Sequence, residues 1–555
     1  MNNDPRLTGR SAAPQGGARP PRGGPAPAEL RAALKRVPWA LALALLLLAI
    51  FQLGAAPLFD VDEGAFSEAT REMLQSGDWG HTTLNGEDRF DKPILVYWLQ
   101  SGSVSLLGLT EFALRLPSAL CAWGWALALF AFARPRLGER TAISAALMMA
   151  TSLGVLAIGR AATADALLNF LLVMAVCDAW RWLETEQKAP LRRAFAWMGL
   201  GLLAKGPVAV LVPVAAAGVW LITAWDWRLA LRRIVQAVSD LPAWALLIGI
   251  AAPWYAYALN RHGQAFIDGF FVRHNLARYT GTLEQHGGGA GYYLEVLPLL
   301  LLPWTPLLVA VARRVASHWR DPLGRFLLGW GVFVLVFFSL SGTKLPHYVL
   351  YGATPFVLLM AIELERCGKV MRWALAVGAL ILLALFVAPA WFLPSLMAYV
   401  RQPEYRALML HAPSPLALMI AGTVAAGVVI GLAAAPVRLR EGLAPSAAPL
   451  LSACVVAMVL LGFGLPWWGT LLQGPVRNAG LIARDRPEVA VQWKLHKPSF
   501  AVYRGQPVPR RDPAPGELAL VNVEHLKKLP ANDANAYETL FEERGVALIR
   551  WRGSR

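Results

Sequence analysis

Long apolar stretches recur along most of this sequence and constrain its fold more than any other feature. Because a helix needs about 20 apolar residues to cross a hydrocarbon core of about 30 Å, such stretches predict membrane spans. Thirteen can be placed, at residues 38–56, 114–133, 141–159, 164–182, 194–204, 206–224, 243–259, 296–312, 325–341, 348–364, 372–393, 416–435 and 448–466. We therefore predict an α-helical polytopic membrane protein. Between 194 and 224, Lys205, Gly206 and Pro207 interrupt the apolar run and predict two helices joined by a turn.

The charge of the chain is strongly positive, since 52 lysines and arginines stand against 36 aspartates and glutamates, for a net +16. In a soluble protein this charge would suggest nucleic-acid binding. Here the basic residues gather in alternate loops between the spans, for example Arg134, Arg136 and Arg140 in one such loop. The positive-inside rule makes these loops cytoplasmic, so the charge indicates orientation and no nucleic-acid partner is predicted.

The spans divide the chain into predicted regions. Residues 1–37 are rich in Pro, Gly, Ala and Arg and are predicted to form a disordered basic cytoplasmic tail. Residues 38–469 form the predicted transmembrane domain, and its loops 57–113 and 260–295 are expected on the outer side of the membrane. Residues 470–555 are predicted to form a small outer α/β domain.

Within that last domain, residues 499–505 and 518–523 are predicted to be strands, and residues 535–545 a helix that ends at Gly545. The four cysteines of the chain suggest neither a disulfide framework nor a CxxC metal motif.

The first outer loop, 57–113, has a net charge of −7, opposite in sign to the whole chain. Its adjacent carboxylates Asp62 and Glu63 come directly after a span, where an ionised carboxylate needs a cation or a polar cavity. The alternative is a solvated helix start, since acidic residues are favoured at helix N-termini. Apolar residues at helical spacing further predict that this loop forms amphipathic helices lying on the membrane surface.

Other charged and polar residues fall at the same membrane face under the orientation set by the basic loops. Each one could be an ordinary ion pair or a snorkelling anchor. Together they predict one polar cavity that faces outward. Besides Asp62 and Glu63, its candidate residues are Asp91, Lys92, Arg160, Asp165, Lys205, His274, Arg278, Lys344, His347 and Tyr348.

The histidines of the chain are possible metal ligands. Those predicted outside include His81, His262, His274, His286 and His347. Some of them could hold a divalent metal with carboxylates, but no tight ligand spacing identifies a site. The metal content stays open, and no cofactor is assigned.

Several motifs of the sequence resemble a known family in the same order along the chain. They are VDEGAFSEATREML and FDKP in the first outer loop, then LRLPSAL, GRAATADALL, LLAKGPVAVLVP, HNLARY and KLPHYVL. They resemble bacterial GT-C glycosyltransferases related to protein O-mannosyltransferases (family 39 type), with the strongest likeness to lipid A 4-amino-4-deoxy-L-arabinose transferases. The resemblance covers residues 38–365 and, by architecture alone, the remainder.

The resemblance implies an inverting transferase that takes a sugar from undecaprenyl phosphate at the periplasmic face of the bacterial inner membrane and passes it to lipid A. It also implies that Asp62 is the catalytic aspartate and that Lys92, Arg278 and Tyr348 surround the donor phosphate. Asp91 and Ala65 depart from the family pattern, which usually has glutamate and often arginine there. A protein or another envelope glycan is the alternative acceptor, and a lipid-linked sugar transporter is the alternative class.

Overall fold

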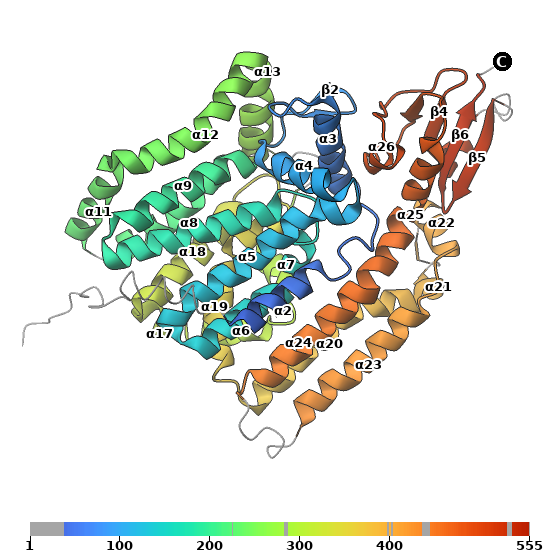
Figure 1. Cartoon of the computed structure of the whole chain (residues 1–555). Helices are drawn as coiled ribbons and strands as arrows, with labels where there is room; N and C mark the ends of the chain where they lie inside the picture. Colours follow the sequence, from blue (N-terminus) through green and yellow to red (C-terminus); the bar gives the residue numbers. More distant parts are fainter. Residues whose placement is uncertain are drawn as a thin grey trace, which may run out of the picture.

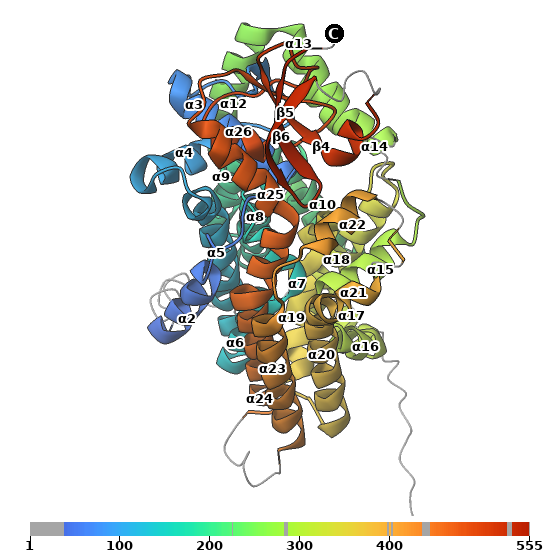
Figure 2. The ribbon, with the colours of Figure 1, turned by 90° about the vertical axis from the view of Figure 1, so that its right-hand side faces the viewer.

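The computed structural model describes residues 38–224, 226–281, 287–396, 399–400, 403–435, 444–529 and 536–553. Most of them lie in helices that form a bundle, with a small β-sheet at one end (Figures 1 and 2). The longer helices up to residue 262 are α2 (Trp39–Ile50), α5 (Glu111–Leu137), α6 (Glu139–Thr151), α8 (Asp165–Thr185), α9 (Lys188–Lys205), α10 (Val208–Thr223), α11 (Trp227–Ser239) and α12 (Leu241–His262).

The second half of the bundle is more broken. Its helices are η1 (Ile267–Leu276), α14 (Ala277–Thr280), α15 (Tyr292–Leu300), α16 (Pro306–Arg313), α17 (Val315–Arg320), α18 (Pro322–Ser339), η2 (Pro346–Gly352), α19 (Ala353–Leu364), α20 (Lys369–Trp391), α23 (Leu416–Ala434), α24 (Ala447–Val459) and α25 (Leu465–Arg484). Short helices also lie between the longer ones: α7 (Leu153–Ile158) in the first half, and α13 (Gln264–Phe266), α21 (Leu393–Leu396) and α22 (Pro403–Leu410) in the second.

The apolar stretches fold as helices, as predicted. Within the described residues, eight helices are long and apolar enough to cross a membrane, and α2 and α10 are shorter apolar helices. The turn predicted near Lys205 is confirmed, because α9 ends at Lys205 and α10 begins at Val208. Residues 141–159 and 296–312, each expected as one span, are instead divided between α6 and α7 and between α15 and α16. The total of thirteen spans stays a prediction.

Side-chain burial in the bundle separates an inner from an outer surface. The largest core cluster packs residues of α5, α6, α8, α10, α18 and α19, including the fully buried Trp125 and Trp330. Large apolar residues such as Val214, Ile222 and Ile248 are exposed instead. Outward-facing apolar side chains are expected where lipid rather than water surrounds a helix.

The first outer loop folds into two helices and a hairpin: α3 (Asp62–Ser76), β1 (Thr83–Leu84), β2 (Glu87–Asp88) and α4 (Leu95–Leu107). α3 ends at Gly77, whose φ of 71° gives the left-handed turn that often closes a helix. Residues 63–73 of α3 are buried, and both views place α3 and α4 at the end of the bundle that carries the sheet (Figures 1 and 2). The predicted helices are therefore present, but the predicted membrane-surface position is wrong for α3, because protein covers it on all sides.

Residues after α25 form a four-stranded sheet in the order β3-β4-β6-β5, from β3 (Ala490–Gln492), β4 (Leu518–Asn522), β5 (Tyr537–Glu543) and β6 (Val546–Trp551). β3 pairs with β4 in parallel, and the other pairs are antiparallel. Helices α26 (Ser499–Arg504) and α27 (Val523–Leu526) complete this part, which we call the C-terminal domain.

Two local predictions for the C-terminal domain are wrong. The apolar run at 499–505 is the helix α26, which ends at Gly505 in the left-handed conformation. The segment expected as a helix holds β5, and Gly545 lies in the two-residue turn that joins β5 to β6, with Glu543 opposite Val546. Strand pairing overrides the helix propensity of the glutamates here. The strand predicted at 518–523 is confirmed as β4.

Candidate functional site

A polar cavity of about 460 Å³ lies where the outer loop, the bundle and the C-terminal domain meet. Its walls come from α3, from the segment between β2 and α4, and from the ends of α8 and α9, η1, η2 and the C-terminal domain. Its polar lining residues are Asp62, Arg89, Asp91, Lys92, Thr163, Asp165, Lys205, His274, His347 and His496.

An apolar cavity of about 400 Å³ adjoins the polar cavity. It is lined mainly by apolar and aromatic residues of α10, η1, α18 and η2, among them Leu211, Phe271 and Phe338. Asp91, Lys92, Lys205 and His274 line both cavities. The arrangement can therefore hold an amphiphile whose apolar part and anionic head lie on either side of these four residues.

Asp62 is the first residue of α3, and its side chain is exposed to the polar cavity. Across the wall, Arg89 pairs with Asp91 at 2.7 Å and lies over the ring of Phe66. Burial alone would lower the pKa of Arg89, but the neighbouring Tyr97 hydroxyl and the Asp91 and Asp62 carboxylates hold it above its ordinary value. Lys92 donates to the Asp91 backbone oxygen at 3.0 Å and lies 3.7 Å from its carboxylate.

A second ion-pair cluster forms the opposite wall. The Asp165 carboxylate accepts from Lys205 and from the Thr163 hydroxyl, and lies 3.5 Å from Nε2 of His347. The Lys205 ammonium also lies 5.5 Å from the centre of the Tyr348 ring. This wall thus joins the polar cavity to the aromatic lining of the apolar one.

The sequence of this chain is similar to one family model and to several named proteins. Residues 91–257 match the family model of dolichyl-phosphate-mannose-protein mannosyltransferase. An undecaprenyl phosphate-α-4-amino-4-deoxy-L-arabinose arabinosyl transferase from Aeromonas hydrophila is 31% identical over 66% of this chain and 68% of the relative. The chain belongs to this arabinosyl transferase family. The relative of the same name from Edwardsiella ictaluri is 31% identical over 57% of this chain, and the chain spans only 58% of that relative's length.

A solved structure supports the fold of this family member. The crystal structure of ArnT from Cupriavidus metallidurans bound to undecaprenyl phosphate superposes with a TM-score of 0.74, at 20% identity, over 92% of this chain and 97% of that one. The predicted class, a multi-pass helical membrane protein of GT-C type, is therefore confirmed.

The structure of this arabinosyl transferase family member brings together eight of the twelve predicted site residues. Asp62, Asp165 and His347 line the polar cavity, Tyr348 lines the apolar one, and Asp91, Lys92, Lys205 and His274 line both. Arg278 belongs to α14, but its side chain lies outside the described residues, as does all of His286.

Three predicted residues line neither cavity. Glu63 binds Arg115 through both carboxylate oxygens, at 2.7 and 2.8 Å. Arg160 donates to backbone oxygens at the end of α2, including that of Ala49 at 2.9 Å. Lys344 is buried and donates to the Ser341 backbone oxygen at 2.6 Å. All three lie at the expected end of the bundle, but their charges are met by other parts of the protein.

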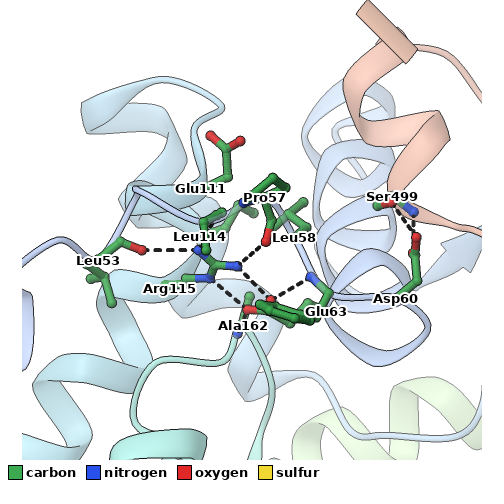
Figure 3. Close-up of polar contacts among 12 residues, drawn as sticks. Leu53, Pro57, Leu58, Asp60, Glu63, Glu111, Leu114, Arg115, Ala162 and Ser499 are labelled. Atoms are coloured by element: carbon green, nitrogen blue, oxygen red, sulfur yellow. Dashed lines mark hydrogen bonds and ion pairs between the residues drawn. The ribbon is translucent and has the colours of Figure 1, made fainter. Parts of the chain in front are cut away.

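Arg115 is a structural residue that the sequence analysis did not identify. Besides Glu63, its guanidinium donates to the backbone oxygens of Leu53, Ala56 and Pro57 (Figure 3). The Glu63 carboxylate also accepts from the backbone amide of Ala162 at 2.7 Å. This buried network fixes the start of α3 and hence the position of Asp62. Its only signal in the sequence was its place within the LRLPSAL motif.

The C-terminal domain closes the site from the other side. Asp60 accepts hydrogen bonds from the backbone amide and hydroxyl of Ser499, at 2.8 and 2.6 Å (Figure 3). Gly64 packs so close to Ser499 that a Cβ would overlap its backbone. His496 lines the polar cavity three residues earlier. The sequence analysis missed His496 because the domain shows no catalytic cluster of its own.

Proposed function

We propose that this protein is an inverting glycosyltransferase that moves an aminoarabinose-like sugar from undecaprenyl phosphate to lipid A. The observation that carries the proposal is the meeting of an apolar and a polar cavity at Lys92, Lys205 and His274. A polyprenyl phosphate has this division between an apolar chain and a charged head. The names of the similar arabinosyl transferases supply the sugar and the donor.

In this proposal the prenyl chain enters the apolar cavity and the phosphate lies at the shared wall. As the bond between the sugar C1 and the phosphate oxygen breaks, negative charge develops on the phosphate. Lys92 stabilises that charge more in the transition state than in the ground state, and this difference accelerates the reaction. Arg278 and Tyr348 are proposed as further groups around the phosphate.

Asp62 is proposed as the catalytic carboxylate, because it is exposed in the polar cavity on the side where the sugar would lie. If the acceptor is a hydroxyl, Asp62 acts as a base that takes its proton. If the acceptor is a lipid A phosphate, whose second pKa is about 6, the nucleophile is already largely ionised and Asp62 orients it.

The proposed reaction takes place at the periplasmic face of the inner membrane. The basic loops between the spans support a cytoplasmic position for the opposite end of the bundle. The first outer loop and the C-terminal domain lie at the same end of the bundle (Figure 1), and residues of both line the polar cavity, which supports a single outer-facing site. A reporter fused after residue 470 should be active only in the periplasm.

The decisive experiment compares lipid A from cells that lack the gene, complemented with either the wild type or Asp62→Ala. We expect the wild type to restore an aminoarabinose-sized mass increase on lipid A and Asp62→Ala to fail at equal membrane abundance. Asp268→Asn is the matched control, because Asp268 is an exposed carboxylate of η1 that lines neither cavity; it should restore the modification.

Other outcomes would change the proposal. Restored modification by Asp62→Ala would remove the catalytic assignment. Unchanged lipid A together with altered masses of proteins or envelope glycans would move the acceptor to those molecules.

A further inference from the structure

Two histidines and an aspartate meet outside the two cavities, where the β1–β2 hairpin packs against the end of α12. Nε2 of His81 lies 2.9 Å from Oδ1 of Asp88, and Nδ1 of His262 lies 3.6 Å from Oδ2. The two imidazole rings stack with their centres 4.4 Å apart. One ligand atom from each residue falls within 4.8 Å of the others.

The hairpin itself brings two of these residues together. Asn85 and Gly86 both have positive φ, 56° and 83°, as expected for a tight two-residue turn. Thr83 pairs with Asp88, so His81, two residues before Thr83, projects on the same face as Asp88. The register of the hairpin therefore fixes this pair before α12 contributes.

The end of α12 presents His262 to that face. Trp254 donates to the backbone oxygen of Gly80 at 3.0 Å, and Arg261 pairs with Asp78 at 2.5 Å, so the hairpin and α12 are held on both sides of the cluster. Phe90 packs edge-on against the His262 ring, with the ring centres 5.1 Å apart. Contacts on both sides of the cluster therefore hold its three side chains in place.

An ordinary ion pair leaves part of this arrangement unexplained. One protonated imidazole suffices for the Asp88 carboxylate, and His81 already lies at hydrogen-bond distance. His262 adds a second ring, and only 11% of its side chain is exposed. Its Nδ1 lies 3.6 Å from the Asp88 carboxylate, which is too far for a hydrogen bond. Its Nε2 is buried without a partner among the described residues. Two protonated rings stacked this closely would repel one another.

We propose that His81, Asp88 and His262 bind a divalent transition-metal ion of the zinc class. Two imidazole nitrogens and a carboxylate oxygen are ligands that such ions prefer, with water completing a tetrahedral shell. The Asp88 side chain is 53% exposed, which gives the ion and its water an entry. Ligand atoms on one tetrahedral zinc lie about 3.4 Å apart. Because the three ligand atoms here lie within 4.8 Å of one another, no pair has to close by more than about 1.4 Å.

The site would position the catalytic machinery without joining it. Asp88 precedes Asp91 and Lys92 by three and four residues, and His262 precedes η1, which carries His274. A metal between Asp88 and His262 therefore ties together the two segments that supply residues to both cavities. Metal binding is measured without a sugar donor, so it succeeds or fails independently of the proposed transfer reaction.

The experiment uses the full-length protein in detergent, purified through a tag free of histidine, stripped with a chelator and dialysed against zinc. We expect one zinc per chain at this site by elemental analysis. His262→Ala and Asp88→Asn should weaken binding in a chelator competition by at least about 10- to 100-fold, because even second-shell changes cost that much. Zinc should raise the melting temperature of the wild type and leave that of Asp88→Asn unchanged.

Two controls keep the result interpretable. Asp88→Asn changes an exposed side chain by one atom, so its zinc-free melting temperature reports whether the fold is retained. His274→Ala removes a histidine of the cavities and should keep the zinc. Loss of zinc in His274→Ala with retention in His262→Ala would place the metal in the cavities, and no bound zinc in the wild type, or equal affinity in all variants, would overturn the proposal.

Discussion

Two buried ion pairs lie at the same end of this molecule and differ in what surrounds them. Glu63 and Arg115 form a closed pair that lines neither of the two cavities, and all three guanidinium nitrogens donate to the Glu63 carboxylate or to a backbone oxygen. Asp165 and Lys205 are nearly as buried but line a cavity of about 460 Å³. Burial of a charged pair therefore does not by itself indicate a reaction site; a cavity beside the pair does.

The difference has an energetic basis. A buried charge is costly unless hydrogen bonds satisfy it, and the Glu63 network is fully supplied by the protein. The Asp165 carboxylate has Lys205, His347 and Thr163 beside it, and the cavity leaves room for water or a substrate to solvate it. The first pair serves the fold, whereas the second can respond to a ligand.

Arg115→Met is expected to have the largest effect, because it leaves Glu63 buried and unpaired. Removing one partner of such a pair costs about 3–5 kcal/mol. We expect a strongly lowered melting temperature and poor recovery of monodisperse protein in detergent.

Lys205→Met is the matched comparison, since it removes a similar buried cation. Its loss of stability should be smaller, because water in the cavity can solvate Asp165. Equal losses for the two variants would break the distinction between closed and open pairs. The double change of Glu63→Gln with Arg115→Met should recover part of the stability lost in the single variant.

The sequence could predict which end of the bundle carries the site, but it could not predict which charged residues there line a cavity. Apolar stretches and basic loops fix spans and orientation by the physics of the bilayer, so charged residues at the ends of spans could be found. Whether Glu63 faces a cavity or Arg115 depends on contacts between distant segments, which no local pattern records. Short segments such as 499–505 fail for the same reason, because tertiary contacts choose between helix and strand there.

Lys92→Ala tests, through enzyme activity, whether a charged residue that lines the cavities takes part in the reaction. Lys92 lines both cavities, and its loss should lower the rate of sugar transfer by about 10²- to 10³-fold, the effect typical of removing one group that stabilises developing charge. Assays with purified protein and a polyprenyl-phosphate-linked sugar would measure this. The melting temperature should change little, and Lys92→Arg should keep part of the rate. A large fall in stability with an intact rate per folded molecule would show Lys92 to be structural.

Asp60 tests the contact that closes the site. Burial raises the pKa of Asp60 to about 6 from its ordinary 3.8, although hydrogen bonds from Ser499 oppose the rise. The neutral carboxyl therefore stabilises the fold fully below about pH 4, and this stabilisation is lost as the pH rises through 6. The side chain in Asp60→Asn stays neutral at every pH. We therefore expect the unfolding free energy of this variant to exceed that of the wild type by at most about 3 kcal/mol at pH 8 and to equal it near pH 4.

The measurement for Asp60 is the difference in unfolding free energy between the two proteins across pH 4 to 8, because other groups cancel in the difference. A constant difference over this range would contradict the raised pKa.

His496 gives the smallest expected effect and the sharpest test of the C-terminal domain. It lines the polar cavity, whereas His525 of the same domain packs against Trp493, with the ring centres 4.8 Å apart, and lines neither cavity. We expect His496→Ala to lower kcat/KM about fivefold, mainly through KM, since one hydrogen bond to a substrate is worth about 1 kcal/mol. His525→Ala should leave kcat/KM unchanged. If both variants behave alike, the domain covers the site without contacting the substrate, and recognition falls to the loop and bundle residues alone.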